Sequence, residues 1–322
     1  MFSEKSIFHF ESKLGNTSLI EIPNGISNGR IFAKCEWENP TGSIKDRVAY
    51  HLVSELLKEK GHDEEIKILE YTGGSLGVSL ALIAKLLDLR LRLVLSESTA
   101  SSTTRRIREL GAQLHFVEKE KGFLGVINTA IGISKEDPSW SFLYQHENKE
   151  NLMCHFNTTG TEILSQVPAK IDSWVASIGT GGTLMGVYNR LIEKFPNIEL
   201  YATNPDELAY GDNAAPNSKK KFSGSGGLGY GKKQLFVMEN ESKVKQHFRV
   251  SYEQCLSSMQ EFYQRESLKI GSSAAANLYA ARKIAKNKGN QHCTVTIFPS
   301  LATSEEWNDV EKYTSTNIAL SY

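Results

Sequence analysis

Hydrophobic residues along the chain form short runs, separated by longer segments in which apolar positions recur with a helical period. The short runs are rich in β-branched and aromatic residues, as is typical of strands. They lie at residues 31–37, 66–71, 91–96, 113–117, 173–178, 198–203 and 294–298. The periodic segments predict helices at residues 43–60, 75–87, 101–110, 182–194, 252–264 and 272–286. This alternation predicts parallel sheets covered by helices, in one sheet or in two.

The segments that follow the strands are where chemistry is expected, because ligands in such folds bind beyond the carboxyl ends of the strands. The polar stretch at residues 147–156 falls between two strand–helix units and is expected to carry a junction between lobes. The only low-complexity tract is the Gly, Ser and Lys segment at residues 218–231.

Composition excludes several classes of partner. Of 322 residues, 40% are hydrophobic, and 37 Lys and Arg balance 37 Asp and Glu, so no net field attracts nucleic acid or an anionic membrane. No run is long enough to span a bilayer, and the N-terminus lacks the pattern of a signal peptide. The 4 cysteines lie far apart, which favours reduced core thiols over a metal or redox site. A cytoplasmic protein that acts on small molecules, without a metal, is expected.

One lysine stands at the start of a predicted helix, in "NPTGSIKDRVAY" at residues 39–50. In one interpretation Ser43 caps the helix, Asp46 suits its dipole, and Lys45 is a solvated charge. In the other, Lys45 is an amine nucleophile at the mouth of a cleft, able to hold a carbonyl cofactor as a Schiff base. These residues alone leave both interpretations open.

The strand at residues 173–178 leads into "GTGGTLMG" and then into a predicted helix. The glycines allow backbone N–H groups to turn toward a ligand, and the helix start adds positive potential, so the segment suits a phosphate. It lacks the lysine of a P-loop, and Leu184 breaks the dinucleotide-binding spacing. The alternative is a tight glycine turn that binds nothing.

A second strand-to-helix turn, "EYTGGSLG" at residues 70–77, offers another nest of N–H groups. Thr72, Gly73, Gly74 and Ser75 provide backbone donors and two hydroxyls that suit a carboxylate. Two anion sites and a lysine in one fold are the combination expected for pyridoxal phosphate and an amino acid.

The third glycine segment, "GSGGLG" at residues 224–229, matches the dinucleotide spacing, but its context does not. No buried strand precedes it and no helix start follows it, so a glycine loop that lines a ligand cleft is favoured, with Gly224 on the substrate side. The neighbouring Lys219, Lys220 and Lys221 are interpreted as a solvated surface run.

With these motifs established, the chain resembles the cysteine synthase and cystathionine β-synthase family, the β-family of pyridoxal-phosphate enzymes (fold type II). The resemblance covers nearly the whole chain. It rests on "LGNTSLI", "NPTGSIKDR", "EYTGGSLGVSLA", "RRIRELGA", "YQHEN", "NTTGTEI", "GTGGTLMG", "GSSAAA" and "EKYTST".

The resemblance implies two open twisted α/β lobes with the cofactor in the cleft between them. The smaller lobe is expected at residues 42–148, and the larger, cofactor-binding lobe at residues 1–41 plus 149–322. Lys45 is implied as the catalytic, Schiff-base lysine. The other implied cofactor-binding residues are Ser75, Gly179, Thr180, Gly181, Gly182, Thr183, Ser272 and Ser273. The implied substrate-binding residues are Thr72, Gly73, Gly74, Ser75, Leu76 and Gln145.

Four departures from the family pattern concern the substrate rather than the cofactor. Relatives commonly carry Ser, Asn and Thr where this chain has Gly73, Ser75 and Leu76, and Leu76 removes a hydroxyl and makes the substrate pocket more apolar. The serine that meets the pyridine nitrogen is ambiguous between neighbouring positions 272 and 273. His146 replaces an apolar aromatic residue, as a titrating group or as a polar cleft-edge residue. The segment "LATSEEWNDV" after Ser300 is interpreted as an insertion.

The resemblance implies β-elimination and β-replacement on a serine-derived or cysteine-like amino acid, with sulfide, a thiol or another small nucleophile as acceptor, as in cysteine biosynthesis. A serine at the pyridine nitrogen is expected to leave the ring unprotonated, so that elimination exceeds transamination and racemisation. A homodimer is expected by analogy. The alternatives are a deaminase or desulfhydrase that releases pyruvate and ammonia, and, from another class, a catalytically silent ligand-binding protein or a dinucleotide enzyme.

Overall fold

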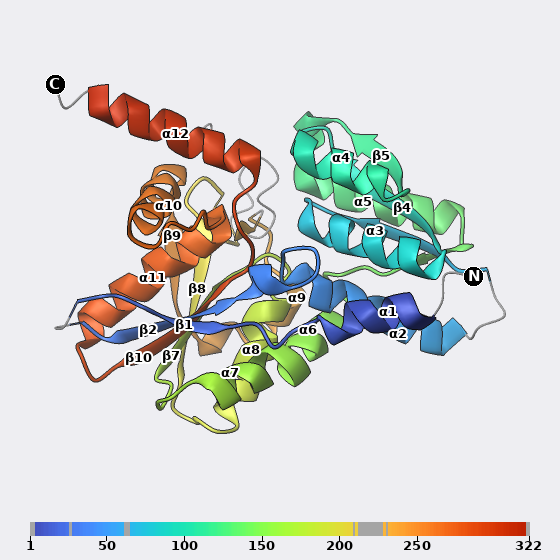
Figure 1. The fold of residues 1–322 in the computed structure, drawn as a ribbon. Coiled ribbons are helices and arrows are strands. Elements are labelled where there is room, and N and C mark those ends of the chain that lie inside the picture. Colours follow the sequence, from blue (N-terminus) through green and yellow to red (C-terminus); the bar gives the residue numbers. More distant parts are fainter. Residues whose placement is uncertain are drawn as a thin grey trace.

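Two α/β lobes make up the protein, each with its own sheet (Figure 1). The computed structural model describes residues 4–319 except 26–27, 61–64, 209, 212–227 and 230. The larger sheet has 6 strands and the smaller has 4. The α/β fold class predicted from the alternating pattern is therefore confirmed, with two sheets rather than one.

The larger sheet is parallel except for the strand at one edge, β1, which pairs antiparallel with β2. All residues of its central strand β10 are buried, as expected for a strand covered on both faces. Helices α10 and α11 pack on one face, and α7 and α8 on the other. In spatial order the strands are β1 (Leu19–Ile22), β2 (Arg30–Cys35), β10 (Cys293–Phe298), β7 (Ser173–Ser177), β8 (Glu199–Pro205) and β9 (Val244–Val250).

The smaller sheet is parallel throughout. Helices α2 and α3 bury their apolar stripes against one face, where Ile68 and Leu93 lie in the same core cluster. Helix α5 covers the other face, against Leu69 and Val94. In spatial order the strands are β5 (Gln113–Val117), β4 (Arg90–Ser96), β3 (Lys67–Tyr71) and β6 (Trp140–Phe142).

The helices join these strands by crossovers along most of the chain. Helix α10 begins with a reciprocal capping box between Ser251 and Gln254, which satisfies N–H groups that a helix start leaves unpaired. The main helices are α1 (Glu4–Ser12), α2 (Lys45–Lys60), α3 (Ser75–Leu87), α4 (Ser101–Glu109), α5 (Gly122–Glu136), α6 (Glu150–Cys154), α7 (Gly160–Gln166), α8 (Gly182–Ile192), α9 (Leu235–Met238), α10 (Tyr252–Glu266), α11 (Ser272–Lys288) and α12 (Ser304–Ala319).

Every strand and helix predicted from the hydrophobic pattern is present, with ends that differ by a few residues. The pattern missed three strands, β1, β6 and β9, and several helices, among them α1, α5 and α12. Strand β9 is an edge strand in which only Val250 is fully buried, so it carries no hydrophobic run. Within the described residues, no helix combines the length and apolar character needed to cross a membrane.

We propose that the lobes divide near residues 42 and 148. The segment 147–156, expected as a junction, includes α6, which lies between α2 and α8. The first helix, α1, packs on the smaller lobe, where Phe10 belongs to the same core cluster as Val53 and Ile83. The N-terminal segment therefore spans both lobes.

Candidate active site

A cavity lies between the lobes, at the carboxyl ends of strands from both sheets. Thr72 follows β3 and Gln145 follows β6 in the smaller lobe, while Gly179 follows β7 and Pro299 follows β10 in the larger lobe. Parallel strands present their carboxyl ends on one edge, so segments far apart in sequence meet here.

Most of the residues predicted for the site line this cavity. They are Lys45, Thr72, Gly73, Gly74, Ser75, Leu76, Gln145, Gly179, Thr180, Gly181, Thr183, Ser272 and Ser273. Gly182 is not among the lining residues, and its N–H donates to Thr180 Oγ1 at 3.2 Å. Gly224 and the three neighbouring lysines lie outside the described residues. The roles of all these residues remain predictions.

Lys45 is the first residue of α2 and faces the cavity. Its backbone N–H donates to Ser43 Oγ at 3.2 Å, so the hydroxyl of Ser43 steadies the turn before the helix. Burial lowers the pKa of the Lys45 amine, against smaller opposing effects of Cys154 and Glu70. A larger fraction of neutral amine makes Lys45 a better nucleophile and base.

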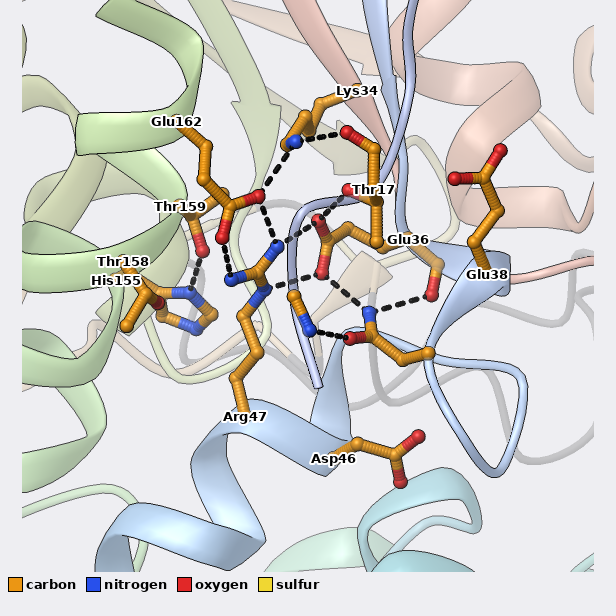
Figure 2. A network of polar contacts seen from close by, with 12 residues as sticks. Thr17, Lys34, Glu36, Glu38, Asp46, Arg47, His155, Thr158, Thr159 and Glu162 are labelled. Atoms are coloured by element: carbon orange, nitrogen blue, oxygen red, sulfur yellow. Dashed lines mark hydrogen bonds and ion pairs between the residues drawn. The ribbon is translucent and has the colours of Figure 1, made fainter. Parts of the chain in front are cut away.

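A buried ion-pair cluster anchors the first turn of α2 to the larger lobe (Figure 2). Arg47 Nε lies 2.7 Å from Glu36 Oε2, and Arg47 Nη1 lies 2.6 Å from Glu162 Oε1 on α7. Lys34 Nζ approaches Glu162 Oε2 to 2.7 Å. Since Arg47 is two residues after Lys45, this cluster holds the lysine's helix in place against the cavity.

The turn between β7 and α8 has the geometry of an anion site. Gly181 has φ +88°, in the left-handed region that favours glycine, and precedes the first turn of α8. Asn151 donates from Nδ2 to Thr180 Oγ1 and to the Gln145 carbonyl, both at 2.8 Å. Asn151 is fully buried, and its Oδ1 has no hydrogen-bond partner in the described part of the chain. Asn151 therefore ties this turn to the Gln145 segment.

A buried histidine supports the same helix start. Thr183 Oγ1 lies 3.1 Å from His155 Nε2, and His155 Nδ1 lies 3.0 Å from Thr159 Oγ1. Burial lowers the pKa of His155 well below its usual range, so the ring is neutral and supplies one donor and one acceptor. No sequence pattern indicated Asn151 or His155 as site residues, because their contacts with Thr180 and Thr183 join segments that lie 29 and 28 positions apart.

Some of the polar groups in the turn between β3 and α3 hydrogen-bond one another. Thr72 Oγ1 accepts hydrogen bonds from the N–H groups of Gly74 at 2.9 Å and Gly77 at 3.2 Å. The N–H groups of Ser75 and Leu76 open α3, where a helix has no intrahelical partner for its first donors. These two donors are the part of the turn best placed to bind a carboxylate.

Gln145 and Glu70 form a buried pair behind this turn. Gln145 Nε2 donates to the Tyr71 carbonyl at 2.9 Å and to Glu70 Oε1 at 3.4 Å. Burial raises the pKa of Glu70 to about 8, against hydrogen bonds from the Tyr71 and Gln145 backbone. The Glu70 carboxyl is therefore mostly protonated at neutral pH, and adds little negative charge beside Lys45.

His146 is a buried part of an aromatic cluster at the cavity wall. It hydrogen-bonds Tyr71 through Nδ1 and stacks on that ring with the centroids 5.3 Å apart. Burial, with Lys45 and Lys232 as smaller causes, lowers the pKa of His146 to about 3. A ring that stays neutral at ordinary pH favours the interpretation of a polar cleft-edge residue over that of a titrating group.

The two candidate serines open α11 on the opposite wall. Ser272 Oγ donates to Glu306 Oε1 at 2.5 Å, and Glu306 itself lines the cavity. No partner for the Ser273 hydroxyl is found in the described part of the chain, although Ser273 also lines the cavity. Glu306 belongs to the segment interpreted as an insertion, and the sequence offered no sign that it reaches this site.

The cavity fits pyridoxal phosphate. That cofactor needs an amine for its aldehyde, an anion site for its phosphate and a partner for its ring nitrogen. Lys45, the turn at residues 179–183 and the neighbouring Ser272 and Ser273 offer these groups on one cavity. At Gly181 an added Cβ would come within 2.7 Å of Val237 Cγ2, so the turn tolerates no side chain there.

Comparison with known proteins agrees with this geometry. Residues 11–300 match the family model described as pyridoxal-phosphate dependent enzyme. Cysteine synthase B of Campylobacter jejuni is 31% identical over 308 residues, which cover 95% of this chain and 96% of that protein.

Solved structures are similar as well. The O-acetylserine dependent cystathionine β-synthase of Helicobacter pylori has a TM-score of 0.82 and 27% identity, with 91% of this chain and 95% of that one covered. The cysteine synthase of Entamoeba histolytica has a TM-score of 0.83 and 25% identity, with 94% and 90% covered. Sequence, fold and cavity agree, and the chain belongs to the family of pyridoxal-phosphate dependent enzymes.

Proposed function

We propose that this enzyme catalyses β-replacement on a serine-derived amino acid such as O-acetylserine or O-phosphoserine, with sulfide or a thiol as the acceptor, in the manner of a cysteine synthase. The observation that carries the proposal is the placement of Lys45 on one cavity with two helix-start turns, one suited to a phosphate and one to a carboxylate. The similarity to cysteine synthases supports it.

When bound, pyridoxal phosphate supplies an electron-withdrawing ring that acidifies the α-proton of an attached amino acid and lets its β-substituent leave. Lys45 Nζ takes that proton and later returns it, a task that suits an amine with a lowered pKa. The N–H groups of Ser75 and Leu76 orient the substrate carboxylate. Asn151 holds the turn at residues 179–183 against the Gln145 segment by donating to both.

A substrate screen tests the proposal. The holoenzyme is incubated with O-acetylserine, O-phosphoserine, serine and cysteine, each with and without sulfide, and the products are identified. A new β-substituted amino acid that forms only with sulfide supports β-replacement. Pyruvate and ammonia in equal amounts, unaffected by sulfide, would instead support the deaminase or desulfhydrase. If the cofactor is bound and no product forms, the result would support the alternative of a catalytically silent ligand-binding protein.

The oligomeric state and the cellular compartment of the protein are also part of this proposal. A homodimer in the cytoplasm is proposed by analogy with the family. The free cysteines, Cys35, Cys154, Cys255 and Cys293, are all buried, which is compatible with a reducing compartment. Light scattering on the purified protein and fractionation of the source cells would test the two statements separately.

Gly181→Asp is expected to weaken cofactor binding at least about tenfold. The change places a negative charge where the phosphate is proposed to bind, and loss of one hydrogen bond to a charged group costs about 1.5–3 kcal/mol. Gly181→Ala is the matched control, since it adds the same Cβ, with its close contact to Val237, but no charge. Cofactor titration followed by absorbance measures both. Equal losses in the two variants would mean that the charge does not face the phosphate.

The double exchange Ser75→Asn and Leu76→Thr is expected to alter substrate selectivity while the cofactor stays bound. These positions open α3 on the cavity wall, and one added hydrogen bond to a carboxylate is worth about 1.5–3 kcal/mol, roughly tenfold or more in relative kcat/KM. Ratios of kcat/KM across the four amino acids measure the effect. Lys85→Gln, on an exposed position of α3, is the control. Unchanged ratios would show that this turn does not recognise the substrate.

A further inference from the structure

Two consecutive glutamates at the start of α12 contact different lobes. Glu306 Oε1 accepts from the Ser272 hydroxyl at 2.5 Å, at the start of α11 in the larger lobe. Glu305 reaches α4 in the smaller lobe, where its Oε1 accepts from the Ser102 N–H at 3.0 Å and from the Ser101 hydroxyl at 3.1 Å. Its Oε2 accepts from the Ser102 hydroxyl at 2.7 Å. One helical turn therefore joins the two lobes.

The Glu305 carboxylate is well placed for this contact. On its own side, Ser304 Oγ donates to Glu305 Oε2 at 3.0 Å, and Thr303 and Glu306 form a reciprocal cap that fixes the start of α12. On the other side it meets the first turn of α4, where helix N–H groups lack intrahelical partners and favour a negative charge. Burial would raise the pKa of Glu305, but the hydrogen bonds from Ser102 outweigh this and lower the pKa to about 2. The carboxylate is therefore ionised at neutral pH.

Little apolar packing accompanies this contact among the described residues. The buried Ile107 of α4 belongs to a core cluster of the smaller lobe, whereas Trp307 and Val310 of α12 belong to one of the larger lobe. Beside the contact lies a second cavity of about 340 Å³, lined by Arg106 of α4 on one side and by Leu301 on the other. Separation of α4 from α12 would thus expose little new apolar surface, so the hydrogen bonds of Glu305 provide most of the attraction between them.

The lobes are joined more firmly elsewhere. Arg47 of α2 forms buried ion pairs with Glu36 and Glu162 of the larger lobe at 2.7 and 2.6 Å, and α6 lies between α2 and α8. In Figure 1, α12 and α4 lie at the top of the molecule and α6 lies below them. Arg106 Nη1 donates to the Thr41 carbonyl at 3.0 Å, just before α2, and so does not join α4 to α12. The lobes can therefore separate at α4 while they stay joined at α2.

We propose that Glu305 is a clasp that holds the active-site cavity closed and restricts its opening. Thr103 of α4 and Thr303 at the start of α12 line both cavities, so separation of these two helices widens the way into the active site. Because a larger ligand needs a wider opening, the clasp restricts large ligands more than small ones. The proposal rests on the proposed function only for the place of the cofactor, and not for the reaction.

Carbonyl reagents that react with the bound cofactor measure this opening without a substrate. The holoenzyme is mixed with hydroxylamine, a small reagent, or with phenylhydrazine, a bulky one, and the change in cofactor absorbance gives a second-order rate constant for each. In Glu305→Ala the ratio of the phenylhydrazine rate to the hydroxylamine rate should rise about tenfold over the parent, the effect of one hydrogen bond to a charged group. A ratio equal to that of the parent would overturn the proposal.

Three further variants separate a clasp from general destabilisation. Glu311→Ala removes the same charge from an exposed position of α12 and should leave the ratio unchanged. Ser102→Ala removes one hydroxyl partner and should raise the ratio by less than Glu305→Ala does. The double variant should match Glu305→Ala alone, because the Ser102 hydroxyl acts only through the carboxylate. Additive effects of the two changes, or a raised ratio in Glu311→Ala, would overturn the proposal.

Discussion

Replacement of Lys45 by alanine is expected to abolish turnover, with a loss of at least about 10³-fold in kcat. The amine is proposed both to hold the cofactor aldehyde and to move the α-proton. Lys45 faces the cavity at the start of α2, and its lowered pKa suits both tasks. Steady-state assays with the best substrate from the screen measure the loss.

Two controls accompany this experiment. Lys58→Ala, in the last turn of the same helix and exposed to solvent, should keep full activity. Borohydride reduction of the parent holoenzyme, followed by peptide mapping, should place the cofactor on Lys45. Turnover that survives in Lys45→Ala, or a label on another lysine, would show that the assignment is wrong.

Arg47→Ala is expected to destabilise the protein by about 3–5 kcal/mol, the range found when one partner of a buried ion pair is removed. Arg47 and Glu36 are both essentially inaccessible to solvent, and Glu162 retains only 14% of its side-chain exposure. Without Arg47, Glu162 would keep Lys34 as its cationic partner, and Glu36 would lose the one ion pair that it forms among the described residues (Figure 2). Denaturant unfolding measures the change.

The exposed pair Arg30–Glu21 provides the comparison, because its side chains are 43% and 48% exposed. Arg30→Ala should cost less than about 1 kcal/mol. Equal effects of the two variants would mean that the buried cluster contributes little. Arg47→Ala is also expected to reduce activity, since the cluster fixes the helix that carries Lys45.

The same cluster sets a pH dependence. Burial would raise the pKa of Glu162, but its hydrogen bonds with Arg47 and Lys34 outweigh this and lower the pKa to about 2. An unfolded glutamate titrates near 4.3. The ionised form therefore stabilises the folded state above about pH 4.3, and this contribution is lost as the pH falls toward about 2. Between these pH values, the free energy of unfolding should change less with pH in Arg47→Ala than in the parent. Denaturant unfolding at several pH values measures this.

Local sequence determined most of the fold. Strands such as β10 are short runs of apolar and β-branched residues because both of their faces are covered, and helices such as α3 carry apolar stripes. Each can therefore be recognised from its own short stretch of sequence. The elements that were missed are those whose burial is partial: β9 at a sheet edge, and the short β6. Their place in a sheet depends on a neighbouring strand, which no local window contains.

Some residues of the candidate site could also be predicted from local sequence, and others could not. Lys45 and the two glycine turns could be predicted, because a helix start that follows a strand binds anions through its own backbone. Gly182 is predicted to bind the cofactor, which stays a prediction; that its N–H donates to Thr180 Oγ1 is a detail of turn geometry that no sequence pattern indicates.

Tertiary structure alone decided which residues support these groups. Asn151 reaches Thr180 across 29 positions, and Glu306 reaches Ser272 across 34. From sequence alone, Glu306 in a polar segment is indistinguishable from a solvated surface charge. Only the folded structure brings its carboxylate within hydrogen-bond distance of the Ser272 hydroxyl. The direction of the Ser272 hydrogen bond is set by that long-range contact rather than by any motif.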